Sequence, residues 1–147
     1  MKLSAKSRYA LAALIYMGRY GYDGEIITIL SLSEKLGISK IYLEQVFSLL
    51  KRGGVVVSMK GAQGGYHLAR SPREISVYDV FSSVELSLFE TTDKTVADKA
   101  SEIETAMQND VFAKLDEAIS ETLGKITLDT LAARAGQYGG EGYMYYL

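Results

Sequence analysis

Residues 30–54 read LSLSEKLGISKIYLEQVFSLLKRGG and carry the signals of two helices joined by a tight turn. Ser31 is expected to cap a short helix that ends at Gly37, and Ser39 to cap a longer helix that ends at Gly53. A helix, a glycine-containing turn and a second helix form the helix-turn-helix pattern. Apolar residues at the spacing i, i+3, i+4 and i+7 predict that the second helix faces a core through Leu43, Val46, Phe47 and Leu50.

The other side of this second helix is polar and contains Lys40, Glu44, Gln45, Ser48 and Lys51. On an isolated helix, such a face would be ordinary solvated surface. Here a β-branched stretch, VVVSMK at 55–60, follows directly, and YHLA at 66–69 predicts a second strand. A helix-turn-helix followed at once by a β-hairpin is a winged helix, so we expect a mainly α fold with a small hairpin wing.

The loop between the two strands is rich in glycine, with Gly61, Gly64 and Gly65. Glycine accepts positive φ without a Cβ penalty, and bare backbone can come close to a phosphate or to the floor of a minor groove. Lys60 and Arg70 flank this loop with positive charge. The alternative, that the loop is only a hairpin turn, stays open at this point.

Charge divides the chain into two unlike halves. Residues 1–75 hold eleven Lys and Arg against five Asp and Glu, a balance of +6, whereas residues 76–147 hold five against thirteen, a balance of −8. A basic half suits a polyanion such as nucleic acid, and an acidic half suits solvent or a protein partner. A first helix, capped by Ser4 or Ser7, precedes the helix-turn-helix and runs to the region of Gly18–Gly24.

Apolar content sets limits on where the protein acts. The 147 residues, 48% of them hydrophobic, suffice for one core, and no apolar run approaches the ~20 residues that cross a bilayer. Lys6, Arg8 and Arg19 interrupt the first apolar stretch, so a signal peptide is not expected. We therefore expect a cytoplasmic protein without membrane contact.

A long amphipathic helix is expected in the acidic half, with apolar positions recurring mostly every fourth residue at Ile103, Met107, Val111, Leu115, Ile119 and Leu123. About 25 residues span roughly 37 Å, which is longer than a small winged helix needs for its own core. We expect these residues to form the interface of a homodimer, although such a helix could also belong to a single-domain core. The expected organisation is a DNA-binding domain at 1–85, a linker, long dimerisation helix and short helix at 86–135, and an apolar tail at 136–147.

Five segments of the chain resemble the Rrf2 family of bacterial winged-helix transcription regulators, and they read MKLSAKSRYAL, ISKIYLEQVFSLLKRGGVV, KGAQGGYHLAR, ISVYDVFSSVE and ITLDTLA. The resemblance runs from residue 1 to about residue 135. It implies a homodimer that binds palindromic operator DNA and represses genes of iron–sulfur, nitrosative-stress or sulfur metabolism.

The resemblance also implies which residues contact DNA. Base-edge contacts fall at Ser39, Lys40, Glu44 and Gln45, and a minor-groove contact falls at Lys60. The chemistry agrees, because Glu can accept a hydrogen bond from cytosine N4 and Gln can bond adenine N6 and N7. The full expected set is Ser39, Lys40, Tyr42, Glu44, Gln45, Lys60, Gly61, Gly64, Gly65 and Tyr66.

Cluster-binding members of the family carry three cysteines between the helix after the wing and the long helix. Here that segment, 86–104, reads LSLFETTDKTVADKASEIE, and the whole chain contains no cysteine. His67, the only histidine, is expected to be packed or solvated in the second wing strand. We therefore expect no metal and no cofactor.

The last residues, EGYMYYL at 141–147, resemble the Tyr- and Met-rich tail of the family's cysteine-metabolism repressors from Gram-positive bacteria. Those repressors lack the cluster cysteines and are implied to act with cysteine synthase, which docks C-terminal peptides ending in an aliphatic residue. Leu147 stands where isoleucine is expected. The alternative is that residues 143–147 pack back on their own domain or dimer.

Two kinds of function remain open from the sequence. The first is a DNA-binding repressor, and the second is a winged-helix protein-interaction module that acts through a partner such as cysteine synthase. An enzyme is not expected, because the chain has no phosphate-binding GxxxxGK motif, no paired carboxylates in a catalytic setting and no nucleophile near His67.

Overall fold

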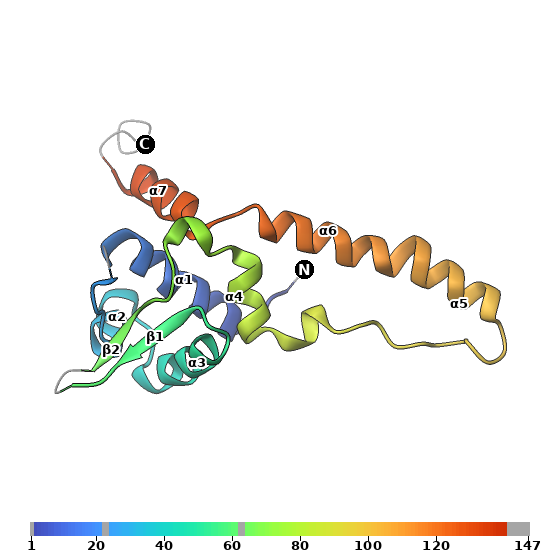
Figure 1. The fold of residues 1–147 in the computed structure, drawn as a ribbon, viewed down its shortest axis with the longest axis horizontal. Helices are drawn as coiled ribbons and strands as arrows, with labels where there is room; N and C mark the ends of the chain where they lie inside the picture. Colours follow the sequence, from blue (N-terminus) through green and yellow to red (C-terminus); the bar gives the residue numbers. More distant parts are fainter. Residues whose placement is uncertain (1, 22–23, 62–63, 141–147) are drawn as a thin grey trace.

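The first three helices form the helix-turn-helix part of the protein, whose computed structural model describes residues 2–21, 24–61 and 64–140 (Figure 1). Helix α1 spans Ala5–Tyr20, α2 spans Ile29–Leu36 and α3 spans Lys40–Arg52. The α2–α3 turn contains Gly37 in the left-handed conformation, with φ of 68°. Glycine adopts this conformation without strain, which explains the sharp reversal between the two helices.

The start of α2 differs from the expectation. Ser31 does not cap this helix; the cap is Thr28, whose side-chain hydroxyl accepts a hydrogen bond from the Ser31 N–H at 3.0 Å. The reason is tertiary, because Ile27, just before the cap, is held in an extended conformation by two backbone hydrogen bonds with Tyr66, of 2.8 and 2.9 Å. The helix therefore begins earlier than the sequence pattern indicated.

The wing is a two-stranded antiparallel hairpin, with β1 at Val56–Met59 and β2 at Gly65–Leu68. Val56 pairs with Leu68 and Met59 pairs with Gly65. A 3₁₀ turn at Pro72–Glu74 leads to α4 at Val77–Val84, which is followed by a second 3₁₀ turn at Leu86–Phe89. These elements complete the winged-helix domain.

The core lies between α1, α3, α4 and α7, the last of which spans Leu128–Gly139. Its fully buried large side chains include Leu14, Met17, Leu32, Phe47, Leu50, Val80 and Leu128. Helix α7 returns to α1 after the long helix (Figure 1). Two backbone hydrogen bonds fix this return: Val77 N–H donates to Ile126 at 2.8 Å, and Leu128 N–H donates to Ile75 at 3.0 Å.

A helical arm projects from this domain and consists of α5 at Ser101–Met107, a π-helical turn at Gln108–Phe112 and α6 at Ala113–Gly124 (Figure 1). The sequence predicted one long amphipathic helix, and the structure adds a π-helical turn in its middle. An α-helix turns once in about 3.6 residues, whereas the apolar positions recur every four. The wider π turn takes up part of this difference and helps to keep them on one side. Among the described residues, no helix is long and apolar enough to span a membrane.

Candidate nucleic-acid interface

Helix α3 presents one buried face and one exposed face, as the sequence predicted. Leu43, Val46, Phe47 and Leu50 have no solvent exposure. The other face, which contains Lys40, Glu44, Gln45 and Ser48, is exposed. Ser39 caps the helix by accepting a hydrogen bond from the Tyr42 N–H at 3.1 Å.

A groove of about 720 Å³ opens between α2, α3 and the wing, and we call it the recognition groove. It is lined by Thr28, Ile29, Leu30, Lys40, Glu44, Gly64, Gly65 and Tyr66. A smaller groove of about 260 Å³, the wing groove, is lined by Ile26, Thr28, Met59, Lys60, Gly61 and Gly64. The fold therefore gathers seven of the ten predicted DNA contacts around two adjoining grooves.

The three remaining predicted contacts are the cap of α3 and two residues within this helix. Ser39 and Gln45 are exposed, and Tyr42 is half-buried with its ring edge-on to Tyr9 of α1, 5.0 Å between ring centroids. Tyr66 is packed in a similar way, with its ring 4.8 Å from that of Phe47. The two tyrosine rings therefore help to position α3 and the wing against the core.

The wing glycines serve different purposes, and the expectation of positive φ holds for one of the three. Gly61 has φ of 154°, in a region that side chains rarely adopt, whereas Gly64 and Gly65 lie outside the left-handed region. Gly65 is buried, and a Cβ there would lie 2.7 Å from the Ile27 carbonyl oxygen. Its role is to let the backbone at Ile27 pair closely with β2.

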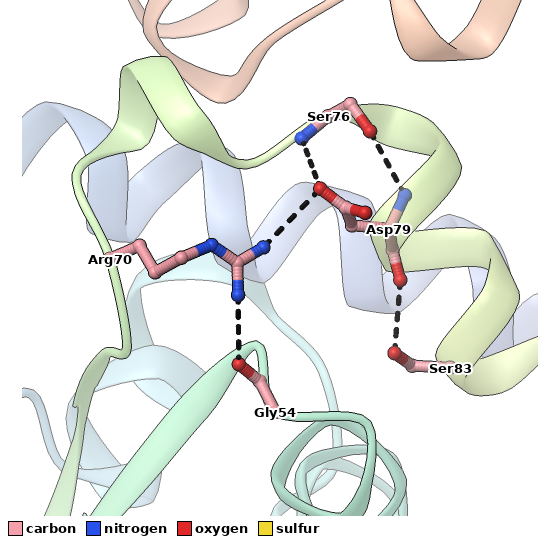
Figure 2. A network of polar contacts seen from close by, with 5 residues as sticks. All are labelled: Gly54, Arg70, Ser76, Asp79 and Ser83. Atoms are coloured by element: carbon pink, nitrogen blue, oxygen red, sulfur yellow. Dashed lines mark hydrogen bonds and ion pairs between the residues drawn. The ribbon is translucent and has the colours of Figure 1, made fainter.

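Arg70 does not contribute charge at the wing tip. Figure 2 shows its guanidinium at the base of the hairpin, donating to the Gly54 carbonyl at 3.2 Å and to the Asp79 carboxylate at 3.3 Å. Asp79 also accepts from the Ser76 N–H at 2.9 Å in a capping box, and Ser83 donates to the Asp79 carbonyl. Arg70 thus ties the wing to α4, and its charge lies at the base of the hairpin and not, as was expected, beside the loop.

Lys60, the expected minor-groove contact, lies just after strand β1. It is exposed at the end of the wing, and it makes no ion pair within the part of the chain that the structure describes. Lys40 is likewise exposed and unpaired there, at the edge of the recognition groove. Two lysine charges therefore border the grooves and can meet phosphates.

A carboxylate that the sequence did not single out holds the start of α1 against the end of α4. Glu85 accepts hydrogen bonds from the Ser4 and Ser7 hydroxyls, both at 2.5 Å, and from the Ser4 N–H at 3.2 Å. The hydroxyl of Ser4, followed by that of Ser7, holds the pKa of the Glu85 carboxyl below its usual value. Ser4 and Ser7 were recognisable as cap candidates, but their partner is far away in the sequence.

Glu104 organises the segment between α4 and α5. One carboxylate oxygen accepts from the N–H groups of Thr95 and Val96, at 2.6 and 2.7 Å, and the other accepts from the Gln108 amide at 2.9 Å. The bond from Gln108, followed by those from the backbone, lowers the pKa of Glu104. The segment is therefore fastened to the arm by a carboxylate whose oxygens are already engaged.

Comparison with known proteins points to one family. A family model named Rrf2, described as an iron-dependent transcriptional regulator, matches residues 3–134. The HTH-type transcriptional regulator IscR of Pectobacterium carotovorum is 34% identical over 131 residues, which cover 89% of this chain and 79% of that protein.

Two solved structures are also similar. IscR of T. potens has a TM-score of 0.72 and 34% identity, with 99% of this chain and 97% of that chain covered. CymR, described as the global cysteine regulator of B. subtilis, has a TM-score of 0.70 and 28% identity, with 91% and 98% covered. These matches confirm the winged-helix fold and the resemblance drawn from the sequence.

Because the family is described as iron-dependent, we asked whether this chain has residues that could bind iron. Iron–sulfur clusters are held by cysteine thiolates, and this chain has no cysteine. Within the described residues, no three His, Cys, Asp or Glu side chains are grouped for a metal, and His67 has its Nδ1 2.9 Å from the Leu68 carbonyl oxygen. The residues present therefore do not fit a thiolate-bound cluster.

Proposed function

The chain belongs to the Rrf2 family of DNA-binding transcriptional regulators, and we propose that it is a homodimeric repressor that binds a palindromic operator. It is not an enzyme, since its family and relatives are transcriptional regulators. The observation that carries the proposal is the recognition groove, which is lined both by Lys40 and Glu44 of α3 and by Gly64 and Gly65 of the wing.

Operator reading is assigned to α3 and the wing. The N-terminal part of a recognition helix contacts base edges in the major groove. In this protein Glu44 accepts from cytosine N4, and Gln45 bonds adenine N6 and N7. The wing then enters the neighbouring minor groove, where Lys60 meets phosphate or base edges and the bare backbone of Gly61 and Gly64 allows a close approach.

Dimerisation is assigned to the arm. Ile103, Val111 and Leu115 are 53%, 47% and 55% exposed, although all three are large apolar side chains. Leu115 also lines an apolar pocket of about 260 Å³, together with Leu3, Phe81, Leu88, Ala118, Ile119, Thr122 and Leu123. A second copy related by a two-fold axis would cover this surface, together with Met107. It would also set two recognition helices about 34 Å apart, the spacing of successive major grooves.

The regulated genes are assigned to sulfur and cysteine metabolism, without an iron–sulfur cluster. Similarity to the cysteine regulator CymR and the absence of cysteine from the chain support this assignment. The predicted contact with cysteine synthase falls on residues 143–147, which lie outside the described residues. It stays a prediction.

The experiment is to incubate the purified protein with a pool of genomic DNA fragments and sequence those it retains. We expect a shared palindrome upstream of sulfur-metabolism genes, and an affinity for it that falls as salt rises, because phosphate contacts release counterions. Retained fragments without a common motif, or binding that does not depend on salt, would overturn operator recognition. The alternative of a module acting only through a protein partner would then account for the protein.

A further inference from the structure

Ile41 is the second residue of α3, and 72% of its surface is exposed. No other large hydrophobic residue in the described part of the chain is as exposed. Single exposed aliphatic residues are common on protein surfaces, so exposure by itself assigns nothing. Its position is more informative, because the first turn of a recognition helix is the part that reaches base edges.

The helix geometry places Ile41 beside the predicted base-reading residues. Glu44, Gln45 and Ser48 follow it at i+3, i+4 and i+7, so all four share one face of α3, and all four are exposed. This face lies opposite the buried stripe that begins at Leu43. Ile41 therefore faces the same binding partner as Glu44 and Gln45.

We propose that Ile41 reads thymine by packing its side chain against the 5-methyl group in the major groove, an inference that rests on the proposed operator binding. Thymine alone among the bases presents an apolar group there. Glu44 and Gln45 have the chemistry for cytosine and adenine, whereas isoleucine has no hydrogen-bonding group. A cytosine opposite Ile41 would bury its N4 amino donor without an acceptor, which is unfavourable. The same residue thus attracts thymine and rejects cytosine.

The expected size of the effect follows from one buried methyl group. Burial of a methylene-sized group contributes about 0.8 kcal/mol, which is about fourfold in affinity. A two-fold symmetric operator has two half-sites, so the two fourfold losses multiply to a loss of affinity of about 15-fold. This loss is far smaller than the loss of operator binding as a whole, so the two can be told apart.

The test replaces thymine with uracil, which pairs identically but lacks the 5-methyl group. The operator recovered from genomic DNA is made with all thymines and with all uracils, and a third duplex of random sequence gives the non-specific affinity. We expect the parent protein to bind the uracil operator about 15-fold more weakly than the thymine operator. The Ile41→Ser variant should bind both equally, with the affinity that the parent has for uracil DNA.

Two further variants serve as controls. Ile41→Val keeps branched methyl groups and should retain most of the preference for thymine. Val57→Thr changes another exposed aliphatic residue, 40% exposed in β1 and outside the lining of both grooves, and should keep the parental ratio of thymine to uracil affinity. Circular dichroism melts establish that each variant is folded.

The outcomes separate the inference from the proposed function. Equal affinity of the parent protein for thymine and uracil operators, both bound more tightly than random DNA, would overturn the role of Ile41 and leave operator binding intact. An equal uracil penalty in the parent and in Ile41→Ser would also overturn it, because another group would then contact the methyl. If neither operator duplex is bound more tightly than the random duplex, operator binding itself is overturned, and the inference with it.

Discussion

The winged-helix domain and the arm are both mainly helical, yet they differ in how they bury apolar side chains. In the domain, every helix contributes to one core, and side chains such as Leu14, Phe47 and Val80 have no exposure. In the arm, all of which the structure describes, the one buried side chain is that of Glu104. The domain is therefore stabilised by its own contacts, whereas Ile103, Val111 and Leu115 of the arm have no apolar cover among the residues that the structure describes.

The strongest test of this difference puts a charge on the arm. Leu115→Glu changes a 55% exposed residue, so the monomer should keep its fold. In a dimer the same carboxylate would be buried without a partner, which is costly, and the protein should dissociate. Operator affinity should then fall by a factor on the order of 10²–10⁴, because the second half-site contact is no longer intramolecular. Sedimentation velocity and a gel-shift titration measure the two effects.

The arm prediction has a matched control in Lys114→Glu, an exposed residue beside Leu115 that lines none of the described apolar pocket. This variant introduces the same carboxylate, with a larger change in net charge because a lysine is lost, and should remain a dimer. A folded Leu115→Glu monomer that binds full operator with parental affinity would show that the arm is not the interface.

The opposite test removes apolar volume from the domain. Phe47 is fully buried and contacts Tyr66, so Phe47→Ala leaves a cavity between α3 and the wing. We expect the free energy of unfolding to fall by about 3–5 kcal/mol, measured by urea denaturation. Val111→Ala in the arm, 47% exposed, should change the stability of the monomer by less than about 0.5 kcal/mol. Equal effects of the two substitutions would contradict the division into a self-sufficient domain and an uncovered arm.

Parts of this division could be predicted from the sequence, because they depend on local signals. The buried stripe of α3 and its Ser39 cap follow from spacing and from residues within one turn. The start of α2 was predicted wrongly, because Thr28 and Ser31 are both good cap residues and the pairing of Ile27 with Tyr66, just before the cap, is visible only in the fold. Contacts between distant segments decided the outcome.

The same reason explains what was missed in the site. Arg70 has the charge and position of a DNA contact in the sequence, and its partners Gly54 and Asp79 become visible only when the hairpin is folded onto α4. Glu85 and Glu104 were not singled out in the sequence, although each accepts three hydrogen bonds. Charged residues were thus the hardest to assign, since their roles depend on partners and not on periodicity.

Within the domain, residues that contact bases should affect operator discrimination without affecting the stability of the fold. Glu44→Ala removes an exposed side chain that lies off the buried stripe of α3. We expect it to lose about 1–3 kcal/mol of discrimination at one or two operator positions, with unchanged stability, and Gln45→Ala should do the same at neighbouring positions. Binding to a set of single-base operator variants measures this. If both variants lose the same affinity for specific and for random duplexes, Glu44 and Gln45 do not contact base edges.

A smaller effect is expected at the end of α4, at Glu85. Its folded-state pKa is lowered by the serine hydroxyls, so its contribution to stability is complete above the ordinary value of 4.5 and is lost as the pH falls through the folded-state value. Glu85→Gln should therefore lower the free energy of unfolding by about 1 kcal/mol near neutral pH, given the partial exposure of the site. The difference from the parent should shrink below pH 4.5. A difference that grows on acidification would contradict the assigned hydrogen bonds.

The smallest effect compares one lysine from each region. Lys60 lies at the wing groove, and Lys114 is exposed on α6, so both are solvated charges of the same kind. Neutralising a lysine that contacts phosphate makes the plot of log affinity against log salt shallower by about one unit, because one counterion fewer is released. Lys60→Ala should show this change and bind up to about fivefold more weakly at fixed salt, whereas Lys114→Ala should match the parent in slope and affinity. Equal slopes for the two variants would mean that the wing contributes only bare backbone to the complex, and that its lysine is as remote from DNA as the arm.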